Sequence, residues 1–203
     1  EYASGLHLLG DNEGAFAIAA TNVTLYMRLA GLDPRRFWNL ALHDLVRELE
    51  QADRGDVSRV ADALLLLGMC ARELGEWPAD LFFMSKLLFE YIDAPKSAHK
   101  SEVHLARQLG RVEEHRAVAI TLMEERLAEF KQAGFVGGLV MTTCMLAVLH
   151  EVAGNAEQAA KLAAELQYLD QTEVAEALAE CRAQIQPRSS ADPGPRTLSV
   201  MER

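Results

Sequence analysis

Three arginines of this sequence share one local pattern, Arg-x-x-Gly: Arg28, Arg72 and Arg107. Glu151 takes the same position before Gly154. A guanidinium can bind a carboxylate through two parallel hydrogen bonds, so a row of arginines suits recognition of a carboxylate-bearing peptide. The pattern has a second interpretation that needs no ligand. A cation in the last turn of a helix also stabilises the helix dipole.

Two further polar residues precede the third arginine at helical spacing. Lys100 and His104 fall on the same face of a helix as Arg107, because residues three and four apart are neighbours on a helix surface. We therefore predict a partner-binding surface made of Arg28, Arg72, Lys100, His104 and Arg107. The expected partner is a protein or peptide that is acidic or bears a free carboxylate.

The histidines and candidate nucleophiles do not form a catalytic or metal-binding motif. His99 and His104 fall on different sides of a helix, and His150-Glu151 lacks the second histidine of an H-E-x-x-H zinc site. The sequence has neither a G-x-S-x-G motif nor a P-loop. We predict no enzymatic activity, no catalytic residue, no metal and no cofactor. An enzyme whose site is assembled from residues distant in sequence stays open as an alternative.

Composition narrows the class of protein further. The 203 residues are 50% hydrophobic and carry a formal net charge of −10, which argues against direct nucleic-acid binding because that needs a basic surface. No apolar run reaches the roughly 20 residues of a membrane span. The three cysteines are far apart and form no C-x-x-C motif, which favours a reducing compartment. We expect a cytoplasmic protein without a membrane segment.

The elements that must position these residues are helices, because apolar residues recur at three and four positions and never alternate for long. Asp33-Pro34 and Asp56 are helix-start signals. Five glycines stand where a left-handed residue after a helix is expected: Gly10, Gly31, Gly75, Gly110 and Gly154. The predicted helices are a short one before Gly10, then 12–30, 34–52, 56–74, 77–93, 97–109, 112–133, 136–153, 156–168 and 171–186.

The short links between these helices predict antiparallel neighbours. The glycines recur at intervals within the range of roughly 20 to 50 residues that is typical of solenoid repeats. The expected pairs are 12–52, 56–93, 97–133 and 136–168, with 171–186 as a capping helix. We therefore predict one repeat domain over 1–186 and a Pro/Ser/Gly-rich, flexible tail over 187–203. The apolar residues within that tail leave open that it docks in a groove of a neighbouring copy.

The pattern resembles the tetratricopeptide repeat, whose signature is W-x2-L-G-x2-Y, then A-x3-F, then P. One copy is Leu64-x2-Leu67-Gly68-x2-Ala71, followed by Ala79-x3-Phe83 and Pro95. A second is Thr143-x2-Leu146-Ala147-x2-His150, followed by Ala159-x3-Ala163. A small residue at Gly68 or Ala147 would let the second helix of a pair pack closely. The signature's Trp and Tyr are replaced in both copies, so the resemblance is to a divergent, bacterial type.

The resemblance implies an all-α, right-handed superhelix of antiparallel helix pairs. It also implies a function, because the first helices of such arrays line a concave groove that binds peptides or partner helices. The five polar residues above would contact the ligand there. The alternative is a regulatory or sensor domain of a bacterial signalling or transcription regulator, which binds a small molecule or signal peptide. A homodimer is also compatible with the sequence.

Overall fold

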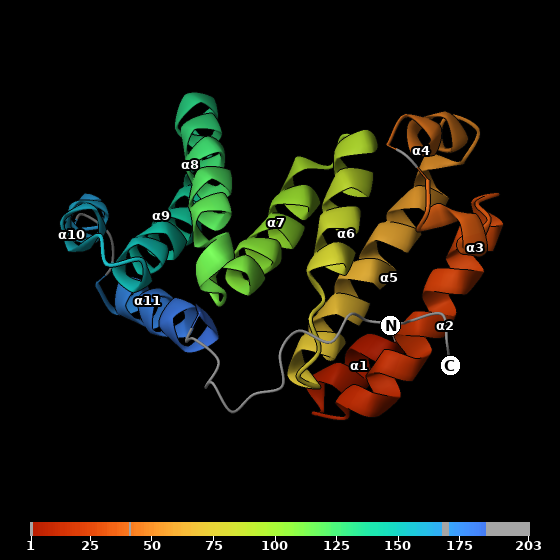
Figure 1. Ribbon diagram of the computed structural model, residues 1–203, viewed down its shortest axis with the longest axis horizontal. Coiled ribbons are helices and arrows are strands. Elements are labelled where there is room, and N and C mark those ends of the chain that lie inside the picture. The colour runs from red at the N-terminus through yellow and green to blue at the C-terminus, as the bar shows by residue number, and fades with distance from the viewer. Residues whose placement is uncertain (1, 41, 168–170, 186–203) are drawn as a thin grey trace. The chain divides into compact units, whose positions relative to one another are not determined.

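The computed structural model describes residues 2–40, 42–167 and 171–185, and these form eleven α-helices and one 3-10 turn with no strand among them (Figure 1). The prediction of an all-α protein is therefore confirmed. The chain divides into two compact units, and the division falls after Ser101, inside the helix Pro95–Gly110. The predicted tail, 187–203, lies outside the described residues.

Within the first unit, helix α5 (Arg54–Glu73) packs between α2 (Asn12–Leu29) and α6 (Ala79–Tyr91). The short α1 (Tyr2–Leu8) packs on α2. The contacts of His7 show the relative direction of α2 and α5. Its Nδ1 lies 2.7 Å from Asn12 Oδ1 and 3.8 Å from Cys70 Sγ. The beginning of α2 is thus beside the end of α5, and the two helices are antiparallel (Figure 1).

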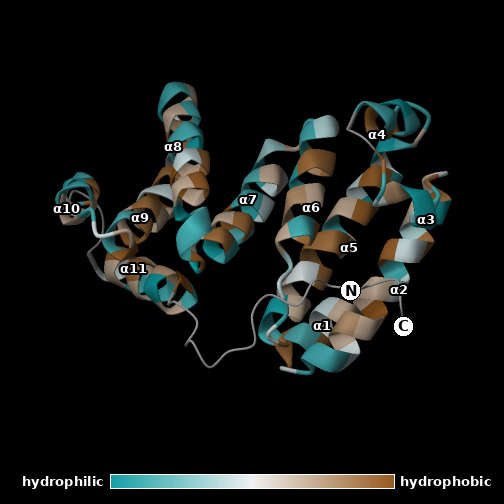
Figure 2. Ribbon diagram, in the orientation of Figure 1, coloured by the Kyte–Doolittle hydropathy of each residue, from teal (hydrophilic) through white to brown (hydrophobic). Residues whose placement is uncertain are grey.

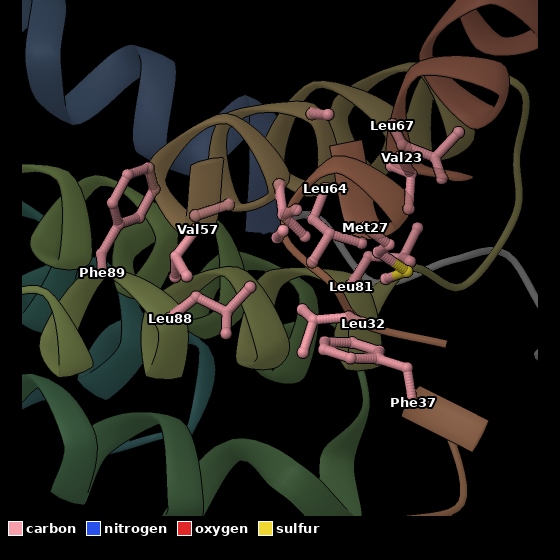
Figure 3. Close-up of a cluster of buried hydrophobic side chains, with 14 of the residues drawn as sticks. Val23, Met27, Leu32, Phe37, Val57, Leu64, Leu67, Leu81, Leu88 and Phe89 are labelled. Atoms are coloured by element: carbon pink, nitrogen blue, oxygen red, sulfur yellow. The ribbon is translucent and has the colours of Figure 1, made fainter. Parts of the chain in front are cut away.

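The core of this unit lies where α2, α5 and α6 meet (Figure 3). Each helix contributes apolar residues at helical spacing, and Figure 2 shows brown segments on both α5 and α6. Asp33 and Asp53 accept backbone hydrogen bonds at the starts of α3 (Pro34–Phe37) and α5, so both helices begin at capped positions. The largest fully buried side chains here are Met27, Phe37, Leu64, Leu67, Phe82, Leu88 and Phe89.

The predicted close contact at Gly68 is confirmed. A Cβ placed on Gly68 would lie 2.6 Å from Cε1 of Phe82, so α6 approaches α5 through the missing side chain. Phe82 is fully buried, whereas Phe83, the residue of the A-x3-F signature, is 49% exposed. The ring at this close contact is therefore that of Phe82 and not that of its neighbour Phe83.

The predicted helix 34–52 is wrong as a single element. The structure has α3, which ends at Phe37, and a separate α4 (Leu42–Leu49). Asn39 supplies a physical reason, because its side-chain amide lies 3.5 Å from the carbonyl of Arg35, the acceptor its own backbone N–H would use in a continuing helix. That N–H donates instead to the carbonyl of Arg36.

The second unit is organised around α9 (Val136–Val152), which packs against three other helices. These are α8 (Arg116–Ala133), α10 (Ala156–Glu165) and α11 (Gln171–Ile185). The predicted helix 112–133 begins later than expected, because Val112 is extended and a 3-10 turn (Glu113–His115) precedes α8. The second part of α7 (Pro95–Gly110) adds Val103 and Ala106 to the core of this unit.

Four of the five predicted left-handed glycines are confirmed: Gly10, Gly31, Gly75 and Gly154. Gly110 is the exception, since it is the last residue of α7 and its φ is not positive. A Cβ there would lie 2.5 Å from Cδ2 of Leu149 and 3.3 Å from Cγ2 of Ile185. Gly110 is therefore needed for close packing rather than for a left-handed turn. Gly134, which was not predicted, has a φ of 66° and ends α8.

Candidate functional site

Arg28 lies in the last turn of α2 and is exposed. Across the described part of the chain, no hydrogen bond or ion pair engages its guanidinium. Two leucines flank it on the same helix: Leu25 is 49% exposed and Leu29 is 58% exposed. The three residues follow the i, i+3, i+4 spacing, so they share one face. An unpaired guanidinium between exposed leucines can bind a carboxylate and an apolar surface together.

This face extends toward the beginning of α2. We call it the α2 stripe, and it consists of Ala17, Ile18, Thr21, Leu25, Arg28 and Leu29. The opposite face of the same helix carries Ala19, Val23 and Met27, all buried in the core. Burial of that face fixes the rotation of α2, so the stripe is held outward by the packing of the unit rather than by contacts of its own.

Arg72, the second predicted arginine, is already engaged. Its Nε and Nη2 donate to Oε1 of Glu73 at 3.1 and 2.9 Å. It lies in the last turn of α5, and the antiparallel packing puts that turn beside the beginning of α2. Arg28 and Arg72 are consequently at opposite ends of the α2–α5 pair. The structure does not bring these two guanidiniums together.

Lys100 is exposed on α7 and interacts with a carboxylate of α5. Partial burial raises the pKa of Asp62, and the positive charge of Lys100 opposes that rise. Beside them, Ser85 is fully buried and bridges three helices: its Oγ donates to the carbonyl of Ala61 at 2.8 Å and lies 2.9 Å from Oγ of Ser101. This polar contact holds α5, α6 and α7 together, which is a structural role.

His104 and Arg107 are buried, with 7% and 6% of their surface exposed. Nη2 of Arg107 lies 3.4 Å from Oε1 of Glu180 on α11 and 3.7 Å from Sδ of Met141 on α9. A guanidinium in this position connects helices within the second unit. Glu151, the exception in the arginine pattern, is exposed and accepts two hydrogen bonds from Arg182 on α11, at 3.0 and 2.9 Å.

Sequence reasoning missed an ion pair in the second unit. Glu102 on α7 is 2% exposed and accepts hydrogen bonds from Nε and Nη2 of Arg126 on α8. Arg126 also donates to Glu129 at 2.8 Å and lies 5.9 Å from the ring centroid of Phe130. No local spacing relates Glu102 to Arg126. Only the tertiary structure brings Glu102 and Arg126 together.

The three cysteines are free and buried. Burial raises the pKa of the Cys144 thiol to about 11, with a smaller contribution from nearby Cys181. Burial also raises the pKa of Cys70 and of Cys181, and in Cys181 the charge of Arg107 opposes the shift. Thiols with raised pKa values are poor nucleophiles near neutral pH.

Within the described ranges, no group of three or more His, Cys, Asp or Glu side chains could hold a metal ion. In the same residues, no helix has both the length and the apolar character that crossing a membrane requires. Comparisons with family models, with curated proteins and with solved structures find no match. The candidate site is therefore identified from the geometry of this chain alone, and the α2 stripe is the surface that this geometry defines best.

Proposed function

We propose that this chain is a protein-interaction module and that the α2 stripe is its contact surface. The single observation that carries the proposal is the position of Arg28, an exposed guanidinium without a partner in the described residues, between two leucines that are about half exposed. Large apolar side chains at an interface supply contact area, and arginine is among the residues most enriched there.

The other four predicted contact residues contribute less to this proposal. Arg72 is paired with Glu73, and Arg107 is buried beside Glu180. His104 is buried, and Lys100 lies near Asp62. A ligand would have to replace an existing interaction at Arg72 or Arg107, whereas Arg28 can bind a carboxylate without losing one. The proposed site is therefore narrower than the arginine row predicted from the sequence.

The proposed architecture is an array of antiparallel helix pairs similar to tetratricopeptide repeats. The α5–α6 pair supports it best, because Gly68 permits a close crossing and Ala79 is buried at the start of α6. The break between α3 and α4 is the main departure from such an array. The function does not depend on this architecture, because a fold by itself does not define a binding site.

Site-specific photocrosslinking tests the function. A photoreactive amino acid at position 21, in the centre of the α2 stripe, should give crosslinked protein adducts in cells. Val118 is the matched control position, because it is 57% exposed on α8 and lies outside the stripe. We expect Leu25→Asp to remove the adducts formed at position 21. Equal adducts from positions 21 and 118, or adducts that persist in Leu25→Asp, would reject the α2 stripe as the contact surface.

A further inference from the structure

The two charges of α2 are placed so that two antiparallel copies of the helix would be complementary in charge. Its two charged residues are Glu13 in the first turn and Arg28 in the last turn. Both are exposed, and neither has an ion-pair or hydrogen-bond partner within the described residues. The helix is therefore neutral, although the whole chain has a formal net charge of −10. Repulsion between two copies of the chain is weaker at such a surface than at an acidic one.

A second copy of α2 running antiparallel brings these charges together. If a two-fold axis passes close to Thr21, Arg28 of one copy lies opposite Glu13 of the other, and the same pair forms again at the other end. In this register Leu25 lies close to Ala17 and Ile18 of the second copy. An isologous contact repeats each interaction twice, so one charge pair in the sequence gives two in the dimer.

The centre of the stripe permits the close approach that this pairing needs. Ala17 and Thr21 are small and exposed, and Thr21 lies between Ile18 and Leu25 along the stripe. Packed helices are separated by about 8 to 10 Å, and small residues at the crossing favour the shorter end of that range. Leu25 then loses its solvent exposure against the apolar residues Ala17 and Ile18 of the second copy.

We propose that the partner of the α2 stripe is a second copy of this chain, bound by antiparallel α2–α2 packing with reciprocal Arg28–Glu13 ion pairs. This inference rests on the proposed function, because it assumes that the α2 stripe is the contact surface. A second copy supplies both a carboxylate and apolar residues at the required positions.

Sedimentation velocity of the whole chain over a range of concentrations tests the proposal through charge reversal. Arg28→Glu places a carboxylate opposite Glu13 and should weaken dimerisation on the order of tenfold or more. The double variant Glu13→Arg/Arg28→Glu exchanges the charges and should restore the dimer. Arg35→Glu is the matched control, because Arg35 is an exposed arginine of α3 outside the stripe, and it should leave the dimer unchanged.

Three results would overturn the proposal. The first is a wild-type chain that stays monomeric at all concentrations. The second is a double variant that dimerises no better than Arg28→Glu, and the third is an Arg35→Glu variant that loses the dimer equally. Circular dichroism melting of each variant separates these results from loss of folding. If the chain is monomeric but position 21 crosslinks to a different protein, the proposed function stands and the second-copy inference fails.

Discussion

Gly68 lies beneath the ring of Phe82, so close that a Cβ on Gly68 would be 2.6 Å from Cε1 and 2.9 Å from Cδ1 of that ring. Both residues are fully enclosed in the first unit, on α5 and α6 respectively. An aromatic ring in a packed core cannot move aside without displacing its other neighbours. The crossing of α5 and α6 therefore depends on the absence of a side chain at residue 68.

We predict that Gly68→Ala destabilises the protein. In a helix the exchange of Gly for Ala normally stabilises by about 1 kcal/mol, because Ala loses less backbone entropy on folding. Here the clash with Phe82 should reverse the sign and lower the free energy of unfolding by about 1 to 3 kcal/mol. Urea unfolding followed by circular dichroism measures the difference.

Gly5 offers a matched control for this substitution. It is also a helical glycine of the first unit, in α1, but a Cβ there would have no neighbour within 4 Å. Gly5→Ala should therefore leave the stability unchanged or raise it slightly. If Gly68→Ala proves as stable as Gly5→Ala, α5 and α6 do not cross at residue 68 as closely as the structure indicates.

The positions of the helices could be predicted from the sequence because the signals are local. Asp33 caps α3 through a residue two positions ahead, as predicted, and apolar periodicity spans a few turns. The predicted cap Asp56 is wrong, because α5 begins three residues earlier and is capped by Asp53. The break after Phe37 was missed because Asn39, whose side chain bonds the backbone there, can also lie inside a helix, and local sequence does not separate the two cases. Gly110 was misinterpreted because its partners, Leu149 and Ile185, come from helices far along the chain.

The candidate site could be predicted only in part, for a related reason. Arg28 and Arg107 share the pattern Arg-x-x-Gly, yet Arg28 is exposed with no partner among the described residues and Arg107 is buried beside Glu180. The shared pattern does not distinguish the two cases, and the helices packed around each arginine do. A pattern can therefore place a guanidinium at a helix end, but its availability to a ligand depends on tertiary contacts.

We predict that Arg126→Leu is strongly destabilising, because it leaves the buried carboxylate of Glu102 without its partner. Breaking a buried ion pair from one side costs about 3 to 5 kcal/mol. The double variant Glu102→Leu/Arg126→Leu removes both charges and should lose clearly less stability than Arg126→Leu alone. Chemical unfolding of the wild type, both single variants and the double variant gives the coupling energy.

The exposed pair Glu151–Arg182 is the control for that cycle, because both side chains are about half exposed. Its coupling energy should be no more than about 1 kcal/mol, as is usual for solvent-exposed pairs. Equal coupling energies for the two pairs would contradict the view that burial makes the Glu102–Arg126 contact important.

We predict that Cys144 makes the fold less stable at alkaline pH. Its pKa is raised from 9.0 to about 11, so between these values the unfolded chain loses the thiol proton while the folded chain keeps it. The folded state then binds more protons than the unfolded state, and stability falls as the pH rises through this window. At pH 10.5 the loss should be about 2 kcal/mol relative to pH 8.

Cys144→Ala isolates this effect from the titration of lysines and tyrosines. The variant lacks the thiol, so its stability should fall less than that of the wild type between pH 8 and pH 10.5. The comparison uses the change with pH within each protein, and any cavity left by the smaller side chain therefore cancels. Parallel pH profiles for the two proteins would show that the thiol of Cys144 ionises equally in the folded and unfolded chains.

We predict that Gly75 and Gly110, which have the same sequence context, respond oppositely to Asn. Gly75 has a left-handed backbone with φ 84° and open space around it. Gly75→Asn should therefore lose less stability than Gly75→Ala, because Asn tolerates a left-handed backbone better. Gly110 faces Leu149 and Ile185 in the core. Gly110→Asn should therefore lose more stability than Gly110→Ala, because Asn puts a larger polar group into that core. Thermal unfolding of the four variants measures both differences, and the same order at both positions would reject the packing role of Gly110.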